Sequence, residues 1–257
     1  MTRQIWVLLH RWVGLVIAGF LFVSGLTGAV ISWDHELDDL LNAHLFETNT
    51  SGPYIPPLEL AERIELRDPR AQVTFVPMMP EQPGEALAFG VSPRVDPKTG
   101  ELYDLGYNEL FIDPVTAVEQ GRRDWGAPWP ITSENFVSFL YVLHYSLHIP
   151  EMWGIDRWGM WLLGGIAMLW TLDSFVGFYL TLPVRRRASP DQPVAVRKQV
   201  SQGWWARWKP AWKIKTTGSA YRINFDMHRA FSLWTWGMLF MLGFTSFSLN
   251  LYSEIFY

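Results

Sequence analysis

Histidines are the residues in this sequence whose spacing points to chemistry. His10 lies in the segment Leu-His-Arg-Trp, two residues before a long uncharged run, and His228 lies in Met-His-Arg-Ala, two residues before another. If both runs are helices that begin on the same side of a membrane, the two imidazoles lie at one depth. Two neutral imidazoles on neighbouring helices can bind opposite sides of one haem iron, and apolar helix faces provide a dry pocket.

An arginine follows each of these two histidines. Arg11 and Arg229 could hold the two haem propionates, because a guanidinium pairs with a carboxylate in a planar fork. Zinc is the weaker fit, since the sequence offers no thiol near either histidine. The simpler alternative is that each His-Arg pair only anchors its helix to lipid headgroups.

The other histidines offer a second set of ligands. His144 and His148 are four residues apart and share one helix face, so they cannot bind opposite sides of one haem. At most one of them is an axial ligand, and His35, just beyond the first uncharged run, is an available partner. We expect His44 to be a solvated loop residue.

Three long apolar runs indicate membrane spans. Residues 12–33 and 230–252 carry no charge, and residues 158–182 carry one, Asp173. Each run exceeds the roughly 20 apolar residues that cross a bilayer as a helix. A cleavable signal peptide is the weaker interpretation of the first run, which is too long for one. Asp173 marks either a proton or cofactor position or a hydrogen bond between helices, and the sequence favours neither.

The flanking charges predict the orientation. Residues 185–229 carry 11 Lys or Arg against two acids, beginning with three consecutive arginines at 185–187, whereas residues 34–157 carry eight against 21. Basic flanks stay in the cytoplasm, so the N-terminus and the basic loop are expected inside and residues 34–157 outside. If the uncharged stretch 135–150 crossed the membrane, the three arginines at 185–187 would lie outside, against the charge bias. We therefore expect a helix capped near Ser133 that lies at the outer interface.

The polar segments differ in character. Strand-like runs at 72–76, 87–91 and 109–112 and a helix at 58–66, separated by Pro and Gly turns, predict a small α+β domain. In the basic loop, aromatic residues alternate with cations at 203–213, which is typical of a segment resting on anionic membrane lipid. The net charge of −4 argues against nucleic acid as a partner.

Several motifs, in order along the chain, resemble one family. They are Leu-His-Arg-Trp-Val-Gly-Leu at 9–15, Gly-Ala-Val at 28–30, His-Glu-Leu-Asp at 35–38, Leu-His-Tyr-Ser-Leu at 143–147, Phe-Val-Gly-Phe-Tyr-Leu-Thr-Leu-Pro at 175–183 and Met-His-Arg at 227–229. This set resembles the PepSY-associated transmembrane proteins. That bacterial inner-membrane, iron-regulated family includes ferric-siderophore reductases of the ferrioxamine-reductase type.

The resemblance implies a PepSY-type α+β domain at about 50–131 and two b-type haems, one at each membrane face.

 

His10 and His228 match the family's inner ligands, and His144 matches its outer one. Longer members continue into a second PepSY-like segment and a fourth spanning helix that carries another outer histidine, whereas this sequence ends at Tyr257. The partner of His144 is therefore left open between His35 and His148.

The expected fold is a membrane α-helical bundle of three spanning helices with a cytoplasmic N-terminus, an outer interfacial helix and a small periplasmic α+β domain. The expected segments are a first span at 1–33, a periplasmic PepSY-like domain at 34–132, an outer helix and loop at 133–157, a second span at 158–184, a basic cytoplasmic loop at 185–227 and a third span at 228–257.

The expected function is electron transfer across the membrane, from a quinol or a cytoplasmic donor through two bis-histidine haems to a ferric siderophore in the periplasm. No hydrolase, nucleotide-binding or metalloprotease motif competes with this interpretation. Two alternatives remain, a haem protein with another acceptor and a non-enzymatic membrane anchor whose outer module binds a peptide or protein partner. Four outer aromatic residues are candidate walls of the siderophore site, with an interfacial belt as the simpler interpretation: Trp125, Trp129, Trp153 and Tyr141.

Overall fold

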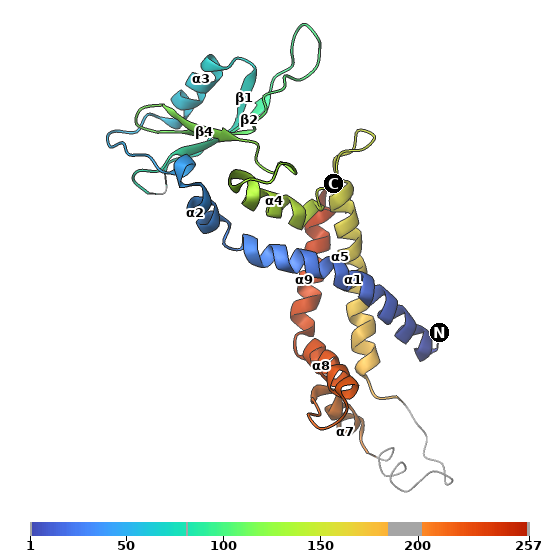
Figure 1. The fold of residues 1–257 in the computed structure, drawn as a ribbon. Coiled ribbons are helices and arrows are strands. Elements are labelled where there is room, and N and C mark those ends of the chain that lie inside the picture. Colours follow the sequence, from blue (N-terminus) through green and yellow to red (C-terminus); the bar gives the residue numbers. More distant parts are fainter. Residues whose placement is uncertain (1, 81, 185–201, 256–257) are drawn as a thin grey trace, which may run out of the picture. The chain divides into compact units, whose positions relative to one another are not determined.

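The computed structural model describes residues 2–80, 82–184 and 202–255 (Figure 1). Contacts divide the chain into two compact units. The first combines Met1–Val23 with Ile149–Tyr257, and the second is Ser24–His148. We call them the helix unit and the sheet unit. Helix α1 (Arg3–Ile31) contributes to both. Residues 185–201 of the expected basic cytoplasmic loop, 185–227, lie outside the described residues.

Two helices form the centre of the helix unit. Helix α5 (Trp158–Thr181) packs along α9 (Trp236–Asn250). Gly243 of α9 approaches α5 so closely that a Cβ atom there would lie 3.0 Å from Thr171 Oγ1. The indole Nε1 of Trp236 donates to the Ser174 carbonyl oxygen at 2.9 Å. Small residues at such contacts allow helix backbones to approach, as is common between membrane helices.

The third apolar run is bent, which differs from the single span expected at 228–257. Helix α8 (Ala220–Trp234) is followed by Thr235, and α9 continues beyond this residue at an angle of 70° to α8. Thr235 Oγ1 donates to the Phe231 carbonyl oxygen at 2.8 Å, a backbone contact that favours bending. By length and composition, the described chain has two candidate membrane spans, α1 and α5, and three if the bent pair counts as one.

The tryptophan-rich segment folds against the start of this bent pair. Helix α7 (Trp204–Trp208) and the 3-10 helix η1 (Lys209–Trp212) bury Trp208 against Leu233 of α8. Arg229 Nη2 donates to the Pro210 carbonyl oxygen at 2.9 Å. These contacts fix the position of α8, the helix that carries His228.

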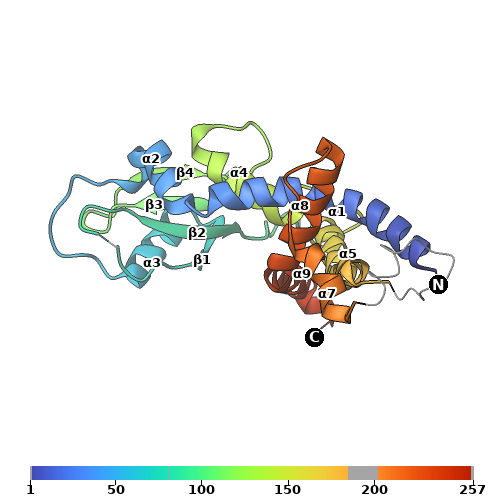
Figure 2. The same ribbon diagram turned by 90° about the horizontal axis from the view of Figure 1, so that it is seen from below.

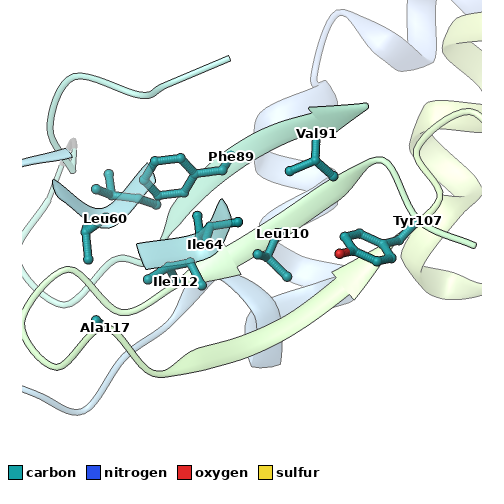
Figure 3. Packing of buried hydrophobic residues seen from close by; sticks show 9 residues of the cluster. Leu60, Ile64, Phe89, Val91, Tyr107, Leu110, Ile112 and Ala117 are labelled. Carbon is teal, nitrogen blue, oxygen red and sulfur yellow. The ribbon is translucent and has the colours of Figure 1, made fainter. Parts of the chain in front are cut away.

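The sheet unit contains a four-stranded antiparallel meander in the order β1-β2-β3-β4. Side chains alternate between the two faces of each strand. Helix α3 (Pro57–Arg67) covers one face, where Leu60 and Ile64 pack against Phe89 and Leu110 (Figure 3). The strands are β1 (Ala71–Phe75), β2 (Leu87–Pro93), β3 (Glu109–Ile112) and β4 (Glu119–Arg123).

The opposite face of the sheet receives α2 (Asp34–Phe46), and α2 in turn contacts α4 (Ser133–Ser146) (Figures 1 and 2). Leu45 of α2 packs with Phe111 of β3 in a second buried cluster. The unit therefore extends beyond the expected 34–132 segment at both ends, because α4 and the end of α1 belong to it.

A buried arginine ties these elements together. Arg123 of β4 is 5% exposed and forms ion pairs with Asp38 of α2, at 2.8 Å, and with Glu109 of β3, at 2.6 Å. Its Nη1 also donates to the Glu134 carbonyl oxygen of α4 at 2.9 Å. One guanidinium thus joins two helices and two strands.

Candidate functional site: a pair of facing histidines

The structure brings His10 and His228 together. The two imidazole ring centroids lie 6.2 Å apart and the ring planes are inclined by 43°. His10 comes from α1 and His228 from α8, and both belong to the helix unit. The His10 side chain is 29% exposed, and His228 is exposed.

Asp173 of α5 is the third polar residue of this site. Its Oδ2 accepts a hydrogen bond from Nδ1 of His10 at 2.9 Å, and its side chain is 12% exposed. A histidine whose Nδ1 donates a proton carries its lone pair on Nε2, which is the atom left for a metal. From sequence, Asp173 was either a proton or cofactor position or a hydrogen bond between helices. In the structure it forms a hydrogen bond to His10, one of the two proposed haem ligands.

The spacing of the two rings fits one metal ion between them. Two imidazoles on opposite sides of a metal would have centroids about 6 Å apart, because each metal–nitrogen bond is about 2 Å. A tetrahedral zinc site would need further protein ligands. No group of three or more His, Cys, Asp or Glu side chains suited to a metal occurs among the described residues. Two histidines alone suit an iron whose other ligands come from a porphyrin.

The two arginines beside these histidines lie in different surroundings. Arg229 Nη2 donates to Asp226 Oδ1 at 2.7 Å as well as to the Pro210 carbonyl oxygen. Arg11 is exposed, and its guanidinium lies 5.4 Å from the ring centroid of Trp12. Arg11 is the arginine with the freer guanidinium for a propionate, while Arg229 holds α8 in place.

His144 occupies a separate site in the sheet unit. Its Nδ1 donates to the Ser24 carbonyl oxygen of α1 at 2.9 Å and lies 3.1 Å from Thr27 Oγ1. The ring packs against Gly28, where a Cβ atom would lie 2.9 Å from its Cε1. As with His10, this arrangement leaves Nε2 for another partner.

The two candidate partners of His144 are engaged elsewhere in this structure. His148 donates from Nε2 to the Phe139 carbonyl oxygen at 2.8 Å, and its ring stacks on Phe139. His35 is 82% exposed and lies 3.6 Å from Asp34. His44 is also exposed and, in place of the expected loop, lies at the end of α2 with its Nε2 3.0 Å from Glu134.

The proposed siderophore-binding aromatics fall into both units. Trp125 and Tyr141 lie together in the sheet unit, with ring centroids 5.7 Å apart. Trp129 is 79% exposed in the same unit. Trp153 belongs to the helix unit, where it is 85% exposed and packs edge-on against Trp158.

Sequence reasoning missed the residues that support the histidine rings. Gly177 of α5 lies against His10, and Ser24, Thr27 and Gly28 surround His144. Gly28 and Gly177 stand within the motifs at 28–30 and 175–183, but small residues are common in apolar helices, so nothing marked them as contacts of the rings. Asp173 carried the clearest signal as the single carboxylate in its span.

The fold and the site define a class of protein, a helical membrane protein with a small antiparallel sheet unit and histidines paired between helices. The family model of the PepSY-associated TM region matches residues 7–256. The chain belongs to this family, which confirms the resemblance noted in the sequence. A comparison with curated proteins found no match.

Proposed function

We propose that this protein is a haem-dependent reductase that passes electrons across the bacterial inner membrane to a ferric siderophore in the periplasm. The observation that carries the proposal is the pair His10 and His228, whose ring centroids are 6.2 Å apart. Membership of the PepSY-associated transmembrane family supports it. The reduction releases iron, because hard oxygen chelators hold ferric iron more tightly than ferrous iron.

The proposed orientation places the N-terminus and the basic loop in the cytoplasm and the sheet unit in the periplasm. The excess of Lys and Arg in residues 185–229 supports this orientation. The histidine pair then lies toward the cytoplasmic side, where a quinol or a cytoplasmic donor supplies electrons. The segment at 203–213 rests on anionic lipid in this arrangement.

At the inner site, His10 and His228 would hold a b-type haem. A bound haem supplies the capacity to accept and donate one electron. Asp173 would orient His10 through the hydrogen bond to its Nδ1. Arg11 is a candidate partner of one propionate, and Arg229 could bind the other only by leaving its contact with Asp226.

At the outer site, His144 would hold a second haem. Its Nδ1 is bonded to the Ser24 carbonyl oxygen, which supports a free Nε2. His35 and His148 remain its candidate partners, and either one would have to leave the contacts described above. The siderophore would bind on apolar aromatic area of the sheet unit, to which Trp125 and Tyr141 contribute, with Trp129 as a further candidate. Trp153 of the helix unit is a separate candidate.

The test is a haem count and a redox titration on the purified full-length protein. We expect a red sample with a low-spin Soret band that shifts on addition of dithionite. We also expect a ferric hydroxamate siderophore to reoxidise the reduced sample. A reduced sample that the siderophore leaves unchanged would indicate another acceptor. A colourless, folded sample would refute the haem proposal and favour a membrane anchor that binds a peptide or protein partner.

A further inference from the structure

We propose that Asp173 is a positioning residue that fixes the ring of His10 and makes the two ligands of the inner haem unequal. This inference rests on the proposed function, because it concerns the same site. It goes beyond ligand assignment, since it gives a role in tuning the site to a residue that binds no iron.

The contact between the two side chains is direct and shielded. Asp173 Oδ2 lies 2.9 Å from His10 Nδ1, and the Asp173 side chain is 12% exposed. A carboxylate accepts and cannot donate, so it selects the ring form that has hydrogen on Nδ1. The ring can then offer only Nε2 to a metal, in an orientation that the hydrogen bond holds.

Gly177 allows α1 and α5 to approach around this contact, and Gly14 lies beside it. A Cβ atom at Gly177 would lie 3.2 Å from His10 Cε1, and one at Gly14 would lie 3.9 Å from Asp173 Oδ2. Gly14 is four residues from His10 on α1, and Gly177 is four residues from Asp173 on α5. All four residues therefore lie at one helix–helix contact. An intramembrane carboxylate is costly, and this one has a dedicated partner.

Among the residues that the structure describes, no carboxylate bonds to the His228 ring as Asp173 bonds to the His10 ring. Within the described part of the chain, the His228 ring forms no hydrogen bond, and its position follows from the docking of α8. Asp226, two residues away, is 1% exposed but pairs with Arg222 and Arg229 instead of the ring. The site therefore has one ligand oriented by a charged acceptor and one held by packing.

This asymmetry has a chemical consequence. A carboxylate bonded to the far nitrogen of an imidazole increases the basicity of the ligating nitrogen. A haem iron held by His10 would also lie near the negative charge of Asp173, and such a charge would favour the oxidised form. Asp173 is thus expected to lower the reduction potential of the inner haem.

A purely structural role, in which Asp173 only ties α1 to α5, predicts a different result. Asp173→Asn keeps the size and an acceptor oxygen but removes the charge, so a helix tie survives while the effect on potential is reduced. Asp173→Ala removes both. Ser174→Ala is the matched control, because Ser174 is the next residue of α5 and its Oγ donates only to the Thr171 carbonyl oxygen.

The experiment compares haem content and reduction potential in the full-length wild type and these three variants. The inner component of the titration is the one that His10→Ala removes. We expect Asp173→Asn to retain the inner haem while its redox equilibrium shifts about tenfold toward the reduced form, or about 59 mV. We expect Asp173→Ala to lower haem affinity at least about tenfold. Ser174→Ala should change neither quantity.

The outcomes separate the two proposals. A wild type without haem would refute the proposed function itself. A wild type with an inner haem whose potential is the same in Asp173→Asn would overturn only the positioning role. If Asp173→Ala fails to fold, Asp173→Asn still decides the question through its potential.

Discussion

Gly177 lies directly against the ring of His10, so that a Cβ atom there would be 3.2 Å from His10 Cε1. This distance is tighter than ordinary van der Waals contact, and the ring would have to move to accept a side chain. Glycine at this position therefore lets a helix backbone serve as one wall of the histidine site.

Gly177→Val should displace the His10 ring and lower haem content at the inner site. Overpacking of this kind costs about 1–3 kcal/mol, and here the ring is the group that must shift. The measurement is haem per protein after purification. Gly165→Val is the control, since a Cβ atom at Gly165 of the same helix has nothing within 4 Å. Equal haem content in the two variants would contradict the prediction.

His10→Ala and His228→Ala should each remove the same haem, because the two ring centroids lie 6.2 Å apart. Each single variant is expected to lose one haem per protein, and the double variant should lose no more than either single one. His44→Ala, whose ring pairs with Glu134 in the sheet unit, is the control and should keep all haem. Additive losses in the double variant would show that the two histidines serve different sites.

Gly28→Ala should disturb His144 without affecting the inner site. A Cβ atom at Gly28 would lie 2.9 Å from His144 Cε1, a distance at which something must move. We expect the haem component assigned to His144 to decrease, as in His144→Ala. Gly25→Ala on the same helix is the control, because a Cβ atom there meets nothing within 4 Å. The readout is the optical spectrum in a redox titration.

The matched positions of His10 and His228 predicted that the two rings meet, since the apolar runs fix the depth at which each helix begins. The partner of His10 did not follow from spacing, because it depends on how α1 packs against α5. Strand β4 was not predicted, since its sequence Glu-Gln-Gly-Arg-Arg is polar and its place comes from pairing with β3. The bend at Thr235 was also missed, because hydropathy continues through it.

Arg123→Met should destabilise the sheet unit strongly. The substitution leaves Asp38 and Glu109 without their buried partner, and breaking a buried ion pair costs about 3–5 kcal/mol. The free energy of unfolding of the full-length protein in urea would measure this loss. Arg122→Met is the control, because Arg122 pairs with Glu119 at the surface and such pairs contribute less than about 1 kcal/mol. Similar losses in both variants would refute the role given to Arg123.

The ion pair of Asp68 with Arg70 makes the stability of the sheet unit depend on pH. Hydrogen bonds from the Arg70 guanidinium, opposed by partial burial, lower the pKa of Asp68 to about 2. A pKa depressed in the folded state stabilises the protein above the ordinary carboxyl pKa of about 4, and the stabilisation disappears as the pH falls toward about 2.

Asp68→Asn should therefore be less stable than the wild type at pH 6, by an amount that stays constant down to about pH 4 and then shrinks toward pH 2. Unfolding in urea at a series of pH values measures this difference. Glu59→Gln, which removes one acid from an exposed pair with Arg63 on α3, controls for the loss of a surface charge. A difference between Asp68→Asn and the wild type that persists unchanged at pH 2 would contradict the prediction, because the protonated carboxyl no longer holds the Arg70 guanidinium as a charged partner.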